Sequence, residues 1–142
     1  MTSSRALIYL FAATLLVQAC GGGDSNPSSP STPAPPFAAI DLTLGTGAEA
    51  TAGRSVTVNY SLWLYSATAP ENKGNAVESG TFPFTINGGG VITGFNQAVT
   101  GMRVGGRRRA IIPPNLAYGS TARNGIPANS TLVFDIELLS VQ

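Results

Sequence analysis

The sequence predicts an α+β domain, in which a curved antiparallel β-sheet wraps around one short α-helix. Several segments alternate apolar and polar residues, as half-buried strands do, and a single segment has helical spacing. Several strands with one brief helix are typical of this fold class. The domain is predicted to span residues 37–142, which is long enough to bury a hydrophobic core of its own.

Alternation predicts four strands. The clearest covers residues 54–65, where Val56 begins a series of apolar or aromatic residues at every second position. Residues 131–139 alternate in the same way. Shorter strands are predicted over residues 82–86 and 107–112. The last of these ends at a pair of prolines, which offer no N–H group to a strand ladder.

One short helix is predicted over residues 93–100. Phe95, Ala98 and Val99 recur at helical spacing there. Gly101 suits the left-handed conformation that commonly ends a helix. This helix is expected to pack its apolar side against the sheet.

Composition excludes several classes of chemistry. The chain has no histidine, which removes histidine-based catalytic triads and histidine zinc sites. The glycine run at residues 88–90 has no following lysine, so it predicts a turn rather than a phosphate-binding loop. The net charge is +1, and the basic run at residues 107–109 is expected to be a solvated strand face, so no nucleic-acid partner is predicted. We expect a reaction that needs no metal, cofactor or acid–base residue, or else a binding function.

The first 36 residues are predicted to be an export signal followed by a tether. Arg5 precedes an apolar run at residues 6–17, which is shorter than the ~20 residues of a typical membrane span. The sequence Val-Gln-Ala-Cys ending at Cys20 resembles a bacterial lipobox, in which that cysteine is lipidated. The signal peptide is therefore placed at residues 1–20, with an ordinary secretory signal or an anchor helix as alternatives. The Gly/Ser/Pro-rich residues 21–36 predict an extended tether or a disordered tail.

The lipobox implies a location. A protein with this signal is expected in a bacterial cell envelope, held at a membrane by the lipid on Cys20. Gly21 resembles the residue that follows the cysteine in lipoproteins of the outer membrane, so we expect the outer membrane, facing the periplasm. Cys20 is the single cysteine, which leaves no intramolecular disulfide to form.

Three motifs in the second half resemble the FKBP-type peptidyl-prolyl cis-trans isomerase family. They are V-G-G-x-R from Val104, I-P-P-x-L-A-Y-G from Ile112 and T-L-V-F-D-I-E-L-L from Thr131, in the family's order and spacing. The resemblance covers residues 42–141 and is looser in the first half. It implies the fold described above, with an apolar pocket between helix and sheet that binds proline-containing polypeptide segments. It also implies macrolide-type inhibitors as potential ligands and a monomer.

The resemblance assigns roles to individual residues. Tyr60, Glu78 and Tyr118 match catalytic positions, and the hydroxyl of Tyr118 is expected to bond a substrate carbonyl. The substrate-binding positions implied in the same way are Val77, Phe82, Val91, Ile92, Phe95 and Phe134. Without the resemblance, most of these apolar residues would be interpreted as plain core.

Part of the pocket departs from the family pattern. Residues 77–80 read Val-Glu-Ser-Gly where the family has Phe-Asp-Ser-Ser, and the preceding residues 66–76 form a longer stretch. Phe95 stands in place of a tryptophan. We therefore expect slower isomerisation than is typical, with an altered preference for the residue before proline.

Prolyl isomerisation suits a site without acid–base residues. The barrier is the loss of amide resonance, about 18–20 kcal/mol, and a dry pocket disfavours the polar planar amide relative to the twisted one. A ten-thousand-fold acceleration requires only about 5.5 kcal/mol. The alternative is a proline-recognising binding or chaperone module with little or no turnover. A structural envelope lipoprotein with a vestigial pocket is a third hypothesis.

Overall fold

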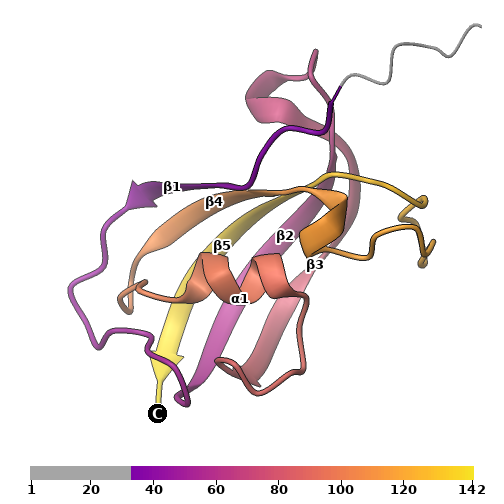
Figure 1. Ribbon diagram of the computed structural model, residues 1–142. Coiled ribbons are helices and arrows are strands. Elements are labelled where there is room, and N and C mark those ends of the chain that lie inside the picture. Colours follow the sequence, from indigo (N-terminus) through magenta and orange to yellow (C-terminus); the bar gives the residue numbers. More distant parts are fainter. Residues whose placement is uncertain (1–32) are drawn as a thin grey trace, which may run out of the picture. The chain divides into compact units, whose positions relative to one another are not determined.

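A curved antiparallel sheet packs one face against a short helix in the computed structural model, which describes residues 33–142 (Figure 1). The strand order is β1-β4-β5-β2-β3, and the sheet stays open. The elements are β1 (Ala38–Thr43), β2 (Ser55–Tyr65), η1 (Pro70–Asn72), β3 (Lys73–Thr85), α1 (Thr93–Val99), β4 (Arg107–Ile112), η2 (Pro114–Leu116) and β5 (Leu132–Val141). The predicted α+β class is confirmed. No helix among the described residues is long and apolar enough to cross a membrane.

The inner face of the sheet carries the core. Because side chains alternate along a strand, β2 and β5 each turn one apolar row toward α1. Leu62 of β2 lies opposite Phe134 of β5, and Tyr60 lies opposite Ile136. The buried part of this row comprises Val56, Val58, Leu62, Leu132, Phe134, Ile136 and Leu138.

The helix lies close to the sheet because of its second residue. Gly94 is buried, and a Cβ atom at that position would overlap the side chain of Ile112 on β4. Phe95, Ala98 and Val99 are buried on the same side of the helix. Thr100 follows as the cap, and the predicted helix therefore ends one residue earlier than expected.

Arg108 ties the end of the helix to β4. Its guanidinium donates to the carbonyl oxygens of Ala98 at 2.8 Å and Thr100 at 3.2 Å, two acceptors left free where a helix ends. Asp41 of β1 accepts a third hydrogen bond from it at 2.6 Å. The expected solvated face at residues 107–109 is therefore wrong for Arg108 and Arg109, which are half-buried and ion-paired, and holds only for the exposed Arg107.

Both edge strands differ from the sequence prediction. β3 begins at Lys73, nine residues before the predicted start at residue 82, and β1 was not predicted. Both strands leave much of their length exposed, and Ile40 of β1 is 50% exposed. An edge strand pairs through its backbone on one side only, so its side chains need not alternate between core and solvent.

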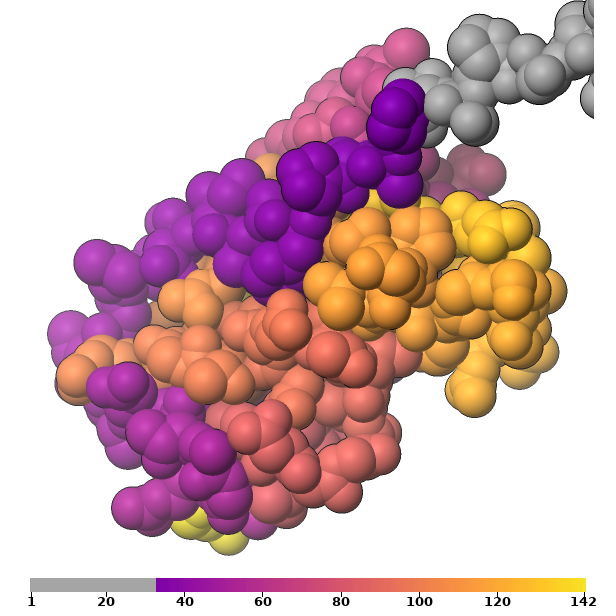
Figure 2. Space-filling model, in the orientation of Figure 1, coloured from indigo at the N-terminus to yellow at the C-terminus, as the bar shows by residue number. Residues whose placement is uncertain are grey.

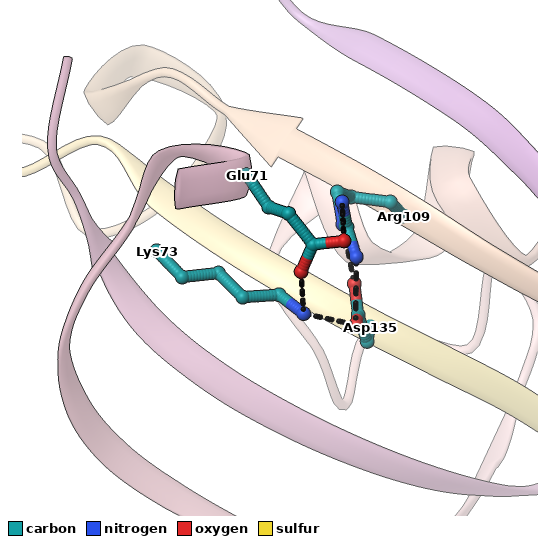
Figure 3. A network of polar contacts seen from close by, with 4 residues as sticks. All are labelled: Glu71, Lys73, Arg109 and Asp135. Carbon is teal, nitrogen blue, oxygen red and sulfur yellow. Dashed lines mark hydrogen bonds and ion pairs between the residues drawn. The ribbon is translucent and has the colours of Figure 1, made fainter. Parts of the chain in front are cut away.

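Four charged residues form a network (Figure 3). It lies on the outer face of the sheet, because Asp135 follows the inward-facing Phe134 along β5. Asp135 of β5 binds Arg109 of β4 at 2.7 Å and Lys73 of β3 at 2.7 Å. Glu71 of η1 reaches the same two cations at 3.2 and 2.9 Å. The Lys73 ammonium also lies 4.5 Å from the centre of the Trp63 ring. The longer stretch after β2 is therefore fastened to the back of the sheet.

Candidate functional site

One cavity opens between the inner face of the sheet and α1. It encloses about 200 Å³, somewhat below the roughly 300–1,000 Å³ of pockets that hold whole small molecules. Its size suits one ring-sized group of a longer ligand. The residues that line it are Tyr60, Leu62, Glu78, Phe82, Gly90, Val91, Ile92, Phe95, Tyr118 and Phe134.

The floor of the cavity is aromatic and almost dry. Phe95 of α1 is 5% exposed, and Phe134 of β5 is 4% exposed. The ring of Phe95 meets those of Phe134, Phe84 and Tyr60 at centroid distances of 5.1, 5.6 and 6.0 Å. Edge-on and tilted contacts of this kind favour aromatic packing beyond simple burial. A group that reaches the floor therefore meets ring carbons.

Tyr60 contributes a polar group to one wall. Its hydroxyl donates to Glu78 Oε1 at 2.9 Å, across the pair formed by β2 and β3. Burial raises the pKa of Tyr60, and the hydrogen bond to Glu78 with its negative charge raises it further. The hydroxyl therefore keeps its proton at neutral pH. The extra methylene of glutamate, relative to the family's aspartate, does not prevent this contact.

Tyr118 supplies a second hydroxyl. It follows η2, which begins at the proline pair that ends β4. Within residues 33–142 its hydroxyl has no hydrogen-bond partner, whereas its ring lies 4.8 Å beneath the guanidinium of Arg123. This hydroxyl is therefore available to a ligand carbonyl.

Ile92 places a backbone donor at the cavity wall. It occupies the cap position before α1, where the first N–H groups of a helix lack intrahelical acceptors. Its carbonyl accepts from Asn96 N, and its own N–H has no acceptor in the described part of the chain. The expected role of this amide as a donor to substrate remains a prediction.

The structure brings together eight of the nine pocket residues predicted from the sequence, and Val77 is the exception. Val77 is half-buried beneath the turn at Gly125, where an added Cβ would lie 3.5 Å from its Cγ1. Two lining residues were missed. Leu62 shares the inward row of Tyr60, and Gly90 adjoins Val91, so alternation and sequence proximity were the signals that pointed to them. Cys20, the predicted lipidation site, lies outside the described residues.

Comparison with known sequences gives a consistent result. Residues 47–139 match the family described as FKBP-type peptidyl-prolyl cis-trans isomerase. FK506-binding protein 3 of Candida albicans is 43% identical over 102 residues, which make up 72% of this chain and 23% of that protein. The chloroplastic peptidyl-prolyl cis-trans isomerase FKBP16-4 of Arabidopsis thaliana is 41% identical over 107 residues, or 72% and 46% of the two chains. The chain thus spans less than half the length of these relatives.

Solved structures show the same likeness. FkpA from Escherichia coli superposes with a TM-score of 0.63 at 32% identity, covering 75% of this chain and 48% of that one. AtFKBP13 superposes with a TM-score of 0.62 at 32% identity, covering 75% and 93%. The second match covers nearly all of the AtFKBP13 chain.

Proposed function

The chain belongs to the FKBP-type peptidyl-prolyl cis-trans isomerase family, and from this premise we propose that it accelerates X-Pro isomerisation in folding or exported proteins. The observation that carries the proposal is the cavity with a buried aromatic floor and two tyrosine side chains in its lining. The ring of a substrate proline would rest on Phe95. The adjoining carbonyl would then face Tyr118, whose hydroxyl is not engaged by the described part of the chain.

This geometry can lower the rotation barrier without moving a proton. The planar amide is more polar than the twisted one, so an apolar lining raises the energy of the planar state relative to the twisted state. A hydroxyl that bonds the carbonyl better in the rotated geometry adds to this difference, because an interaction accelerates a reaction only when it strengthens in the transition state. Glu78 holds the Tyr60 ring in place by accepting a hydrogen bond from the Tyr60 hydroxyl.

Tyr118→Phe is expected to lower kcat/KM for an X-Pro peptide, because one hydrogen-bond donor is lost. The decrease should correspond to a loss of about 1–3 kcal/mol of transition-state stabilisation. Exchange measured by nuclear magnetic resonance on the purified protein gives this value directly. Tyr65→Phe is the matched control, since Tyr65 lies on β2 but does not line the cavity. An unchanged rate in Tyr118→Phe would reject the hydroxyl's role. A wild-type protein that binds the peptide but does not accelerate exchange would support the binding-module hypothesis instead.

We further propose that the protein is a bacterial envelope lipoprotein, with residues 21–36 as a tether to the isomerase domain at residues 37–142. The support is the lipobox-like sequence ending at Cys20 and the Gly/Ser/Pro-rich composition that follows it. Outer-membrane attachment facing the periplasm is part of this proposal and rests on Gly21.

Expression in a bacterial host is expected to place the protein in the membrane fraction with acyl groups on Cys20. Mass spectrometry of the mature N-terminus should show the acylated cysteine, and Cys20→Ala should abolish both the modification and the membrane association. A mature wild-type chain that starts elsewhere, or that has an unmodified Cys20, would contradict the proposal.

A further inference from the structure

Arg123 brings a positive charge against Tyr118, a residue that lines the cavity. The guanidinium of Arg123 lies 4.8 Å from the centre of the Tyr118 ring, and the residue is exposed. None of the ion pairs among residues 33–142 includes it. By contrast, Arg103, Arg108 and Arg109 each pair with a carboxylate. Arg123 is therefore free to bind an anion supplied by a ligand.

The backbone holds Arg123 in this position. A two-residue turn joins it to Ile126 through reciprocal hydrogen bonds, Arg123 N to Ile126 O at 2.9 Å and Ile126 N to Arg123 O at 2.8 Å. Gly125 takes the positive φ of 75° that this turn needs. Ile126 is 6% exposed and anchors the turn in the core. This turn thus holds Arg123 on an anchored base.

The cavity also has a negatively charged lining residue. Glu78 lines the cavity with its carboxylate bonded to the hydroxyl of Tyr60. The turn that bears Arg123 reaches β3 next to this residue, because its Gly125 lies against Val77. Residues of both charges therefore belong to this part of the molecule, and the carboxylate of Glu78 is already engaged by Tyr60.

We propose that Arg123 determines specificity by binding an acidic side chain adjacent to the substrate proline. The proposal rests on the proposed function, in which the proline enters the cavity and its neighbouring carbonyl faces Tyr118. A residue beside that carbonyl would then lie next to the Arg123 guanidinium. The planar N–H donors of a guanidinium can bind a carboxylate at two points. A lysine at the same place meets a like charge. Because the pair is exposed to solvent, the expected preference is about threefold to tenfold at low salt.

Three peptides test the proposal on the full-length protein. They are identical except for Glu, Gln or Lys next to the proline, and both kcat/KM and Kd are measured by nuclear magnetic resonance. The Glu peptide is expected to exceed the Gln peptide about threefold to tenfold, and the Lys peptide to fall below it. In 1 M salt, where the screening length is about 3 Å, the ratio should approach one.

Variants of Arg123 test whether its charge is responsible for the preference between the peptides. Arg123→Gln keeps a long polar side chain and should bring the Glu-to-Gln ratio to about one, while Arg123→Lys should retain part of the preference. Arg107→Gln is the matched control, since Arg107 is an exposed arginine that does not line the cavity, and it should keep the wild-type ratio.

The outcomes are distinguishable. Equal Kd and kcat/KM for the Glu and Gln peptides in the wild type would overturn the proposal, as would a preference that survives Arg123→Gln. A protein with no turnover on any peptide would overturn the proposed isomerase function. The ratio of the Kd values would then still decide the role of Arg123.

Discussion

Phe95→Ala is expected to lower the free energy of unfolding by about 3–5 kcal/mol, the usual cost of emptying a buried aromatic site. Phe95 is 5% exposed and packs on three other rings, so the surrounding side chains can collapse only partly into the space it leaves. Urea denaturation gives the value. The same substitution removes the floor of the cavity, and peptide binding should weaken with it.

Phe82→Ala is the matched control for this effect. Phe82 also lines the cavity, but it is 40% exposed and stacks only against Phe84. Its removal should cost clearly less than that of Phe95, because 40% of Phe82 stays in water in the folded protein, against 5% of Phe95. Equal losses for the two variants would show that Phe95 is not the packing centre that its ring contacts indicate.

Asp135→Asn is expected to destabilise the fold by about 2 kcal/mol, below the roughly 3–5 kcal/mol for breaking a fully buried ion pair, because Asp135 is only half-buried. The Asp135 side chain is 12% exposed, between Arg109 at 12% and Lys73 at 19% (Figure 3). Removing its charge leaves two cations close together, held only by the exposed Glu71. Urea denaturation at neutral pH measures the loss.

Asp135 also makes the stability of the fold depend on pH in the acidic range. Burial raises the pKa of Asp135, but hydrogen bonds from Arg109 and Lys73 more than offset this, and the pKa falls below its ordinary value. The contribution of Asp135 to stability is therefore complete above its pKa in the unfolded chain, about 3.9. It is lost as the pH falls through the lower pKa of the folded protein. Asp135→Asn should show a flatter stability profile below about pH 4.

Glu137→Gln provides the comparison for Asp135. Glu137 is half-buried two residues along β5, on the same outer face, and joins no ion pair within residues 33–142. Its substitution should change stability by less than about 0.5 kcal/mol. A comparable loss in both variants would mean that net charge, and not the four-residue network, sets the stability of this face.

The residues changed in these predictions lie in different parts of the fold. Figure 2 shows the segment near residues 115–130, in orange and yellow, beside the segment that contains α1. Tyr118 of the first segment lines the cavity, and its ring contacts Arg123. Phe95 and Asp135 lie on opposite faces of the sheet by strand alternation, since Asp135 follows the inward Phe134. Phe95→Ala and Asp135→Asn, which have the largest expected losses of stability, therefore test the inner and the outer face of one sheet separately.

Much of the site could be predicted because its signals are local. Tyr60 belongs to a row of alternating residues, Phe95 to a helical stripe, and Tyr118 and Phe134 to motifs with a fixed spacing. Each of these patterns specifies which face a side chain takes within its own element. The lining of the cavity follows once the elements pack.

Periodicity determined the fold class, the central strands β2, β4 and β5 and the helix, because core burial imposes a pattern on the sequence. The pocket residues were predicted from the resemblance of three sequence motifs to the FKBP family. Tertiary structure decided the rest. The edge strands β1 and β3 form by backbone hydrogen bonds that leave no such pattern, and the turn at Gly125 covers Val77. Lys73 meets Asp135 across 62 residues of chain, a contact set by strand register, which no local pattern encodes.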